Sequence, residues 1–174
     1  MTTAESQLGY QTNPSTSYCN KYSAFWHAGT ATLCGPGLRS EEWCADFAAW
    51  VWRRGGAQFT YGYGSGEINA SSGSFYLWAL SHGTWHAAGS GYSPQPGDVA
   101  VYGLDPTTGT AAHVAIVTYD SAGARGPDVV NGDGDRTAFS VVETGTDQYE
   151  ADTPGSDSPL SGYAAPIPAS PANA

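Results

Sequence analysis

The chain has 174 residues, a length that fits one compact domain and leaves no room for two of ordinary size. Apolar residues make up 40% and aromatic residues 13%, whereas charged residues make up only 13%, and this balance excludes intrinsic disorder. The formal net charge is −10 with only six lysines and arginines, which disfavours binding to nucleic acid or to an anionic membrane surface.

A folded domain is predicted at residues 18–165. Both ends of the chain are predicted to be loose, namely a polar N-terminal segment at 1–17 and a Pro/Ala-rich tail at 166–174. No apolar run approaches the roughly 18 residues that a transmembrane helix needs. Residues 1–5 carry neither the basic nor the apolar region of a signal peptide.

The three cysteines lie in two kinds of surroundings. Cys19 and Cys34 lie in polar, turn-rich segments that accommodate a disulfide, whereas Cys44 opens an apolar run. A bridge between the first two would close a loop of about 15 residues, worth about 3 kcal/mol in the chain-entropy model. We therefore expect Cys19 and Cys34 to be paired and Cys44 to be free, an arrangement that requires an oxidising compartment.

Start and stop signals predict a helix around Cys44. Ser40 is a good N-cap, acidic residues follow it, two arginines lie in the last turn, and Gly55 suits the left-handed C-terminal position. Cys44 would lie about one turn from the N-terminus, where unpaired N–H groups favour a thiolate. A lone cysteine at a helix start is more often a buried structural residue than a nucleophile, so the interpretation depends on a partner histidine.

Of the four histidines, His27, His82 and His86 are expected in packing or surface roles. His113 lies near the start of a β-branched segment, residues 111–119, which is predicted as a strand antiparallel to the preceding one at 98–102. An imidazole at the start of a buried strand is fixed in orientation, as a general base must be. Further strands are expected at 128–131, 139–144 and 161–165, and a second helix at 71–85.

The strand at residues 128–131 runs into a polar turn that contains Asn131 and Asp133. Either residue could hold the second imidazole nitrogen of His113 and set its tautomer. The chain order is then a cysteine on a helix, a histidine on a strand and a polar residue on the next strand, which is the arrangement of papain-like thiol enzymes. The expected fold is α+β, a papain-like single domain with N-terminal helices packed on an antiparallel sheet of five or six strands.

Three segments, residues 40–50, the turn at 96–99 and the strand start at 113–117, resemble the CHAP family of cysteine- and histidine-dependent amidohydrolases/peptidases. The similarity extends from about Cys19 to Tyr163, and the preference for arginine over lysine resembles secreted proteins of high-GC bacteria. The resemblance implies that Cys44 is the nucleophile and His113 the base. The family usually has Glu at the third position and Asn two residues later, where this chain has Asn131 and Asp133.

Many relatives also have Gln just before the nucleophile as an oxyanion donor, where this chain has Trp43. The backbone N–H of Cys44 is therefore the expected donor.

The resemblance implies a secreted hydrolase that cleaves an amide bond of bacterial peptidoglycan, as an amidase or an endopeptidase, through a thioester. Two alternatives are an NlpC-type peptidase of wall peptides and a catalytically silent CHAP-like module that binds wall material or a partner protein. The expected partner is peptidoglycan or its stem peptides, with no nucleic acid and no membrane.

No cofactor is expected. Residues 131–135 carry oxygen ligands at alternate positions, like half of a calcium loop, but the bidentate glutamate of a full loop is missing. The relatives that bind calcium do so at an acidic loop before the nucleophile, which this chain does not show. Calcium is therefore disfavoured, and zinc more so, because no Cys/His cluster has the spacing of zinc ligands.

Overall fold

The computed structural model describes residues 2–13, 17–27, 34–35, 40–119, 127–134, 142–146 and 158–169. The helical elements are a short 3-10 helix η1 (Glu5–Gln7), α1 (Lys21–Trp26), α2 (Cys44–Arg54) and α3 (Gly73–His82). The strands are β1 (Trp85–Ala87), β2 (Val99–Tyr102), β3 (His113–Tyr119), β4 (Asp128–Asn131), β5 (Glu143–Thr146) and β6 (Leu160–Ala164).

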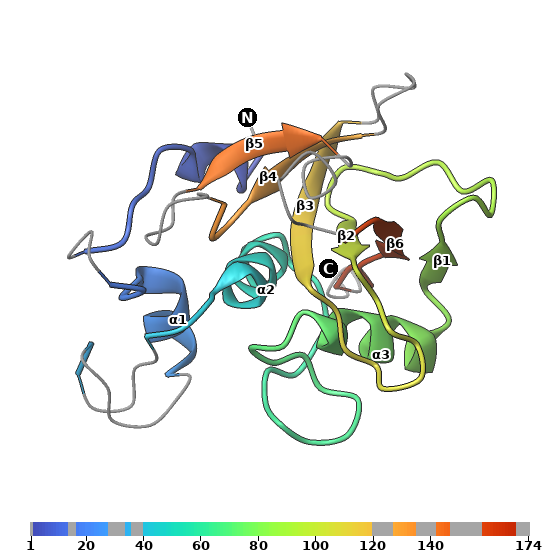
Figure 1. The fold of residues 1–174 in the computed structure, drawn as a ribbon, viewed down its shortest axis with the longest axis horizontal. Coiled ribbons are helices and arrows are strands. Elements are labelled where there is room, and N and C mark those ends of the chain that lie inside the picture. Colours follow the sequence, from blue (N-terminus) through green and yellow to red (C-terminus); the bar gives the residue numbers. More distant parts are fainter. Residues whose placement is uncertain are drawn as a thin grey trace, which may run out of the picture.

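The six strands form one sheet in the order β1-β6-β2-β3-β4-β5, and every neighbouring pair is antiparallel (Figure 1). β2 and β3 pair as expected from the sequence, with Val99 opposite Ile116 and Tyr102 opposite His113. A few helices on a single antiparallel sheet make the domain α+β, which confirms the predicted fold class.

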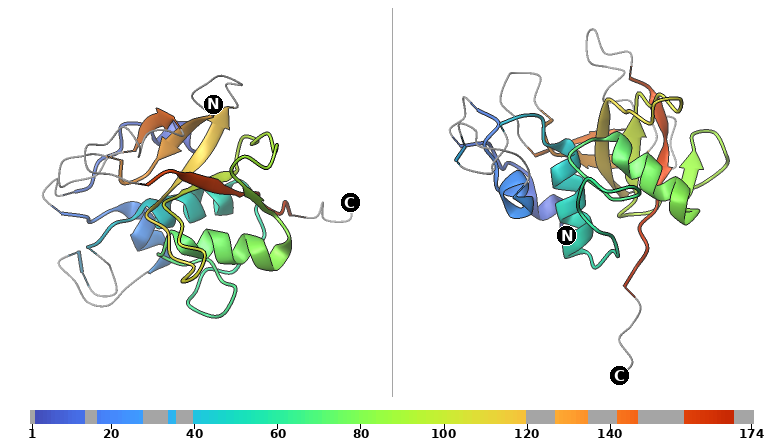
Figure 2. Two further views of the ribbon diagram at one scale, coloured as in Figure 1. Left: turned by 45° about the vertical axis from the view of Figure 1, so that its right-hand side comes forward. Right: turned by 90° about the horizontal axis from the view of Figure 1, so that it is seen from below.

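The central strands are buried on both faces because small and β-branched residues fill them. Alternation along each strand divides their side chains into two core clusters. One face packs with the helices through Val99, Val101, Val114, Ile116 and Val130, and the other packs Ala100, Tyr102, Ala115, Val117 and Val129. The three α-helices lie on one side of the sheet (Figure 1, Figure 2).

Helix α2 is the centre of the helical layer. It packs against both β3 and α1, and its apolar side chains are almost all buried. An aromatic cluster joins the two helices: Tyr22 of α1 stacks on Trp43 at a centroid distance of 5.3 Å and meets Phe47 edge-on at 5.0 Å. Such pairs add about 0.5–1.5 kcal/mol each beyond their buried area, so they fix the start of α2 firmly.

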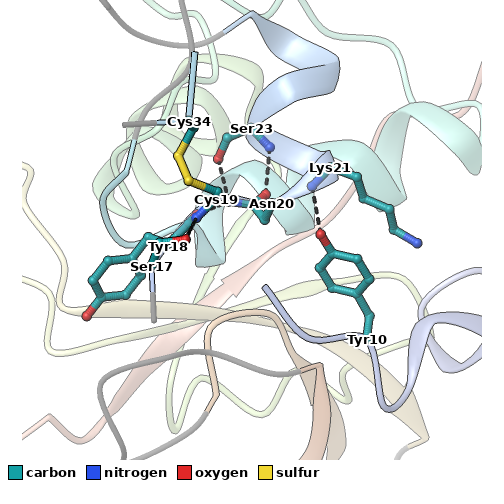
Figure 3. The surroundings of a disulfide bond; sticks show 8 residues. All are labelled: Tyr10, Ser17, Tyr18, Cys19, Asn20, Lys21, Ser23 and Cys34. Carbon is teal, nitrogen blue, oxygen red and sulfur yellow. Dashed lines mark hydrogen bonds between the residues drawn. A yellow bond between two sulfur atoms is a disulfide. The ribbon is translucent and has the colours of Figure 1, made fainter. Parts of the chain in front are cut away.

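The disulfide joins Cys19 to Cys34, with their Cα atoms 5.3 Å apart, and Cys44 is free (Figure 3). The residue after Cys19 begins α1: the side chain of Asn20 accepts the N–H groups of Tyr22 at 2.9 Å and Ser23 at 2.8 Å. The bridge therefore holds the capped end of the helix that packs against α2, and the predicted pairing of the three cysteines agrees with the structure.

The predicted start of α2 was wrong, whereas its end at Arg54 was predicted correctly except for the conformation of Gly55. The helix begins at Cys44 with Trp43 as its N-cap, so Ser40 does not cap it and the two glutamates lie outside it. Asp133 accepts the backbone N–H of Trp43 at 3.0 Å, and this partner from the segment after β4 explains why the local signal at Ser40 failed. At the other end, Gly55 has a right-handed φ of −79°, and the left-handed residue is Gly56 at 82°.

Three other segments depart from the sequence prediction. α3 ends at His82, and Trp85, predicted as the last residue of that helix, is instead the first residue of β1, because β6 pairs with this segment. β5 covers 143–146 rather than 139–144, and residues 139–141 lie outside the described part. Within the predicted tail, Ile167 accepts the N–H of Gln58 at 2.8 Å, and Ala169 donates to Gly56 at 2.9 Å.

Candidate active site

Cys44 is the first residue of α2, which places its thiol nearer to the helix terminus than the sequence predicted. The side chain is 6% exposed. The first N–H groups of a helix have no intrahelical acceptor, so the local field favours an anion at this position. The thiolate is the reactive form of cysteine.

His113 and Asn131 lie at one end of the sheet. His113 is the first residue of β3 and Asn131 is the last residue of the antiparallel neighbour β4, so the two strands bring them together. Nε2 of His113 lies 2.9 Å from Oδ1 of Asn131, and both residues are buried. Because an amide oxygen only accepts, the Nε2–H group is the donor, and Nδ1 is the ring nitrogen with the lone pair.

The segment after β4 fastens the start of α2 to the same end of the sheet. Asp133 adopts a left-handed φ of 65° and receives the backbone N–H of Trp43 on its carboxylate at 3.0 Å. Gly132 lies so close to Phe47, one turn after Cys44, that a side chain there would overlap the Phe47 Cβ atom. These two contacts hold Cys44 at the sheet end that carries His113 and Asn131.

The two candidates for the polar residue therefore have different contacts. Asn131 bonds the imidazole of His113, whereas Asp133 holds the N-terminus of α2. The side-chain amide nitrogen of Asn131, Nδ2, is buried without a hydrogen-bond partner. A buried donor without a partner costs about 1–3 kcal/mol, and such groups are rare in folded proteins.

Ser72 is a site residue that the sequence analysis missed. Its hydroxyl lies 3.3 Å from the Cys44 thiol, at the start of α3. No motif marks it, because a serine next to Gly73 at a helix start has the ordinary explanation of a capping residue. Tyr102, at the end of β2, adds a buried ring whose centroid lies 6.0 Å from that of His113.

The segment before the disulfide also approaches this end of α2. The pKa of Tyr18 is raised by burial and by the negative charges of Asp133 and Glu42. The phenol therefore lies within electrostatic range of Asp133 and Glu42, near the start of the helix of Cys44.

Two of the remaining three histidines pack on aromatic rings. His82 stacks on Trp78 with ring centroids 4.4 Å apart, and His86, in β1, stacks on Tyr92 at 3.6 Å. Among the described residues, no group of three or more His, Cys, Asp or Glu side chains is placed to hold a metal ion. Residue 135, the last of the half calcium loop, lies outside the described part.

The turn at residues 95–98 has a structural function. Asp98 accepts the hydroxyl of Tyr92 at 2.9 Å and the backbone N–H of Gln95 at 2.8 Å. Its backbone carbonyl receives the N–H of Val117, so the turn is joined to β3. Burial raises the pKa of the Asp98 carboxyl, and the two hydrogen bonds oppose that rise.

Across the residues that the structure describes, no helix is long and apolar enough to span a bilayer. No curated protein and no solved structure matches the chain. A family model for the CHAP domain matches residues 36–131, more than half of the sequence. The matched range begins shortly before α2 and ends at the last residue of β4, so it contains Cys44, His113 and Asn131. With this match, the chain belongs to the CHAP domain family.

Proposed function

We propose that the protein is a thiol-dependent hydrolase that cleaves an amide bond in bacterial peptidoglycan, as an amidase or an endopeptidase. CHAP domains are typically hydrolases of this type, and the family match covers the helix of Cys44 and the strands of His113 and Asn131. The observation that supports the proposal is that Cys44 begins a helix held at the end of the sheet where the imidazole of His113 is hydrogen-bonded to Asn131. A base oriented in this way is the requirement for activating a thiol.

In the proposed reaction, Nδ1 of His113 takes the proton of the Cys44 thiol, which leaves a thiolate and an imidazolium. The sulfur attacks the carbonyl carbon of the substrate, and the carbonyl electron pair moves onto oxygen. The C–N bond then breaks as the imidazolium gives its proton to the departing amine, and a thioester remains. Water then attacks the thioester while His113 takes a proton from the water. The C–S bond breaks, its electron pair returns to the sulfur of Cys44, and the carboxylic acid leaves.

Asn131 would orient the imidazole through this cycle. Its side-chain oxygen accepts the Nε2–H group in both the neutral and the protonated ring, so the ring keeps one orientation while Nδ1 gains and loses a proton. The backbone N–H of Cys44, at the start of α2, would donate to the oxyanion. Asp133 would act on the reaction only indirectly, by holding the helix N-terminus.

We also propose that the enzyme acts outside the cytoplasm. A disulfide between Cys19 and Cys34 persists in oxidising compartments, and CHAP domains usually act on the extracellular wall. The wall substrate follows from the family; the residues alone specify acyl transfer to a thiol. Nothing in the described residues favours an NlpC-type specificity over this assignment.

The test is digestion of purified peptidoglycan from several bacteria, with the bond cleaved identified by mass spectrometry of the products. The wild-type chain should release fragments with new amine and carboxyl ends, and Cys44→Ala and His113→Ala should reduce turnover by at least about 1,000-fold, since members of a catalytic unit each cost this much. His82→Ala removes a histidine that packs on Trp78 and serves as the matched control. Wall binding without turnover by the wild type would instead identify a silent binding module.

A further inference from the structure

We propose that Ser72 is a third residue of the nucleophile site, whose hydroxyl group stabilises the thiolate of Cys44. This inference rests on the proposed function of Cys44 as the nucleophile. The Ser72 Oγ atom lies 3.3 Å from the Cys44 Sγ atom, within hydrogen-bonding distance for sulfur. Both residues are almost fully buried, 7% exposed for Ser72 and 6% for Cys44, so water contributes little solvation to the sulfur.

The direction of this hydrogen bond depends on the protonation state of the sulfur. In the thiol form, either the S–H or the O–H group can donate. A thiolate has no proton, so only the hydroxyl of Ser72 can donate to it. Hydrogen bonds to an ionised acceptor are about twice as strong as neutral ones, and the hydroxyl therefore favours the thiolate over the thiol.

The structure also shows that Ser72 is not used for capping. It occupies the N-cap position of α3, where a serine oxygen ordinarily accepts an N–H group of the first turn. Its side chain makes no such bond. The local hydrogen bonds are made instead by Ser74, whose hydroxyl donates to the carbonyl of Ser71 at 2.7 Å. The Ser72 hydroxyl is thereby left to the sulfur of Cys44.

Backbone packing fixes the position of this hydroxyl. Gly73 lies against the backbone of Gly109 so closely that a Cβ atom at Gly73 would overlap the Gly109 carbonyl oxygen. Gly109 belongs to the loop that leads into His113. Within this loop, the side chain of Asp105 accepts the N–H of Thr107 at 2.8 Å. The start of α3 therefore packs against the loop that precedes His113, and this packing holds Ser72 beside Cys44.

The assay is the rate of alkylation of the purified chain by iodoacetamide between pH 4 and pH 9, which requires no wall substrate. The disulfide is retained, so Cys44 is the thiol that reacts. We expect Ser72→Ala to react about tenfold more slowly than the wild type at pH 6, where the thiolate depends on its stabilising partners. The two rates should converge to within about twofold at pH 9, where the thiol ionises without help.

Ser74→Ala is the matched control, because it removes a buried hydroxyl from the same turn of the same helix. Its alkylation profile should match the wild type, and Ser72→Thr, which restores a hydroxyl, should recover most of the rate at pH 6. Circular dichroism verifies the fold of each variant. If Ser72→Ala does not fold, Ser72→Gly carries the same test, since it also lacks the hydroxyl and adds no atom.

A Ser72→Ala profile that superimposes on the wild type would overturn the proposal. An equal slowing in Ser74→Ala would also overturn it, because the effect would then come from loosening of α3. The result is separable from the proposed function: inactivity on peptidoglycan together with a shifted Ser72→Ala alkylation profile would refute the wall substrate and leave the role of Ser72 standing.

Discussion

Replacing Gly132 with alanine should disturb the junction between the end of β4 and helix α2, which carries the proposed nucleophile Cys44. An ideal Cβ atom at this position would lie 2.5 Å from the Phe47 Cγ atom, and closer still to its Cβ. Carbon atoms in optimal contact are about 3.5–4.0 Å apart. Because the clash includes the Cβ atom of Phe47, rotation of the ring does not relieve it, and α2 must move away from the end of β4 by about 1 Å.

The magnitude follows from this displacement. Overpacking a well-packed core costs about 1–3 kcal/mol. For a chain of this size, each kcal/mol lowers Tm by about 2–4 °C, so the variant should unfold about 2–12 °C below the wild type. A shift of about 1 Å between catalytic groups costs about 100-fold in rate, because Asn131, the neighbour of Gly132, belongs to the group that orients His113.

Thermal unfolding measures the loss of stability. The rate of peptidoglycan cleavage measures the loss of activity, and alkylation of Cys44 at pH 6 gives a second measure that needs no substrate. Gly83→Ala is the control. Gly83 has a φ of 68° and an open environment, so alanine there costs about 1–2 kcal/mol of left-handed strain at the far end of α3. Gly83→Ala should lose stability but not reactivity. If Gly132→Ala retains wild-type reactivity, the close approach of β4 and α2 does not position the site.

The double variant Cys19→Ser/Cys34→Ser should be less stable by about 3 kcal/mol, because the bridge closes a loop with a sequence separation of 15. Reduction of the wild type should give the same loss in urea unfolding, and an unchanged midpoint would contradict the loop argument. The carboxyl of Asp98 has a pKa raised by burial above its ordinary value of 3.8, so its ionised form destabilises the fold. Asp98→Asn keeps an acceptor for Tyr92 and Gln95, and its stability relative to the wild type should rise as the pH increases from 3 to 7. The carboxyl is protonated in both states at the low end of this range, so a pH-independent difference would refute this explanation.

The sequence predicted those features that depend on local pattern. The β-branched segments became strands, the apolar run after Cys44 became α2, and the contexts of Cys19 and Cys34 identified the paired cysteines. What failed depends on contacts between distant segments. The start of α2 is set by Asp133, which lies 90 residues further along the chain, and β1 exists because β6 pairs with it.

The same distinction applies to the candidate site. A cysteine at a helix start and a histidine at a strand start are visible as patterns, but the sequence left Asn131 and Asp133 as alternatives. The structure shows that both side chains are engaged, one with the imidazole and one with the helix terminus. Ser72 had no signal at all, because its contact with Cys44 joins the N-termini of two helices that are 28 residues apart at this point.

The negative charge of the chain is compatible with the proposed reaction because the site needs no fixed cation. Within the described residues, the three basic side chains lie over aromatic rings: Lys21 is 4.5 Å from the ring centre of Tyr10, and Arg53 and Arg54 lie over Phe59 and Trp50. The proposed thiolate–imidazolium pair carries no net charge, like the neutral thiol–imidazole pair, so neither form changes the total of −10. Anionic wall polymers are repelled by such a protein. In the proposed function, hydrogen bonds and shape, rather than long-range attraction, would therefore select the amide that is cleaved.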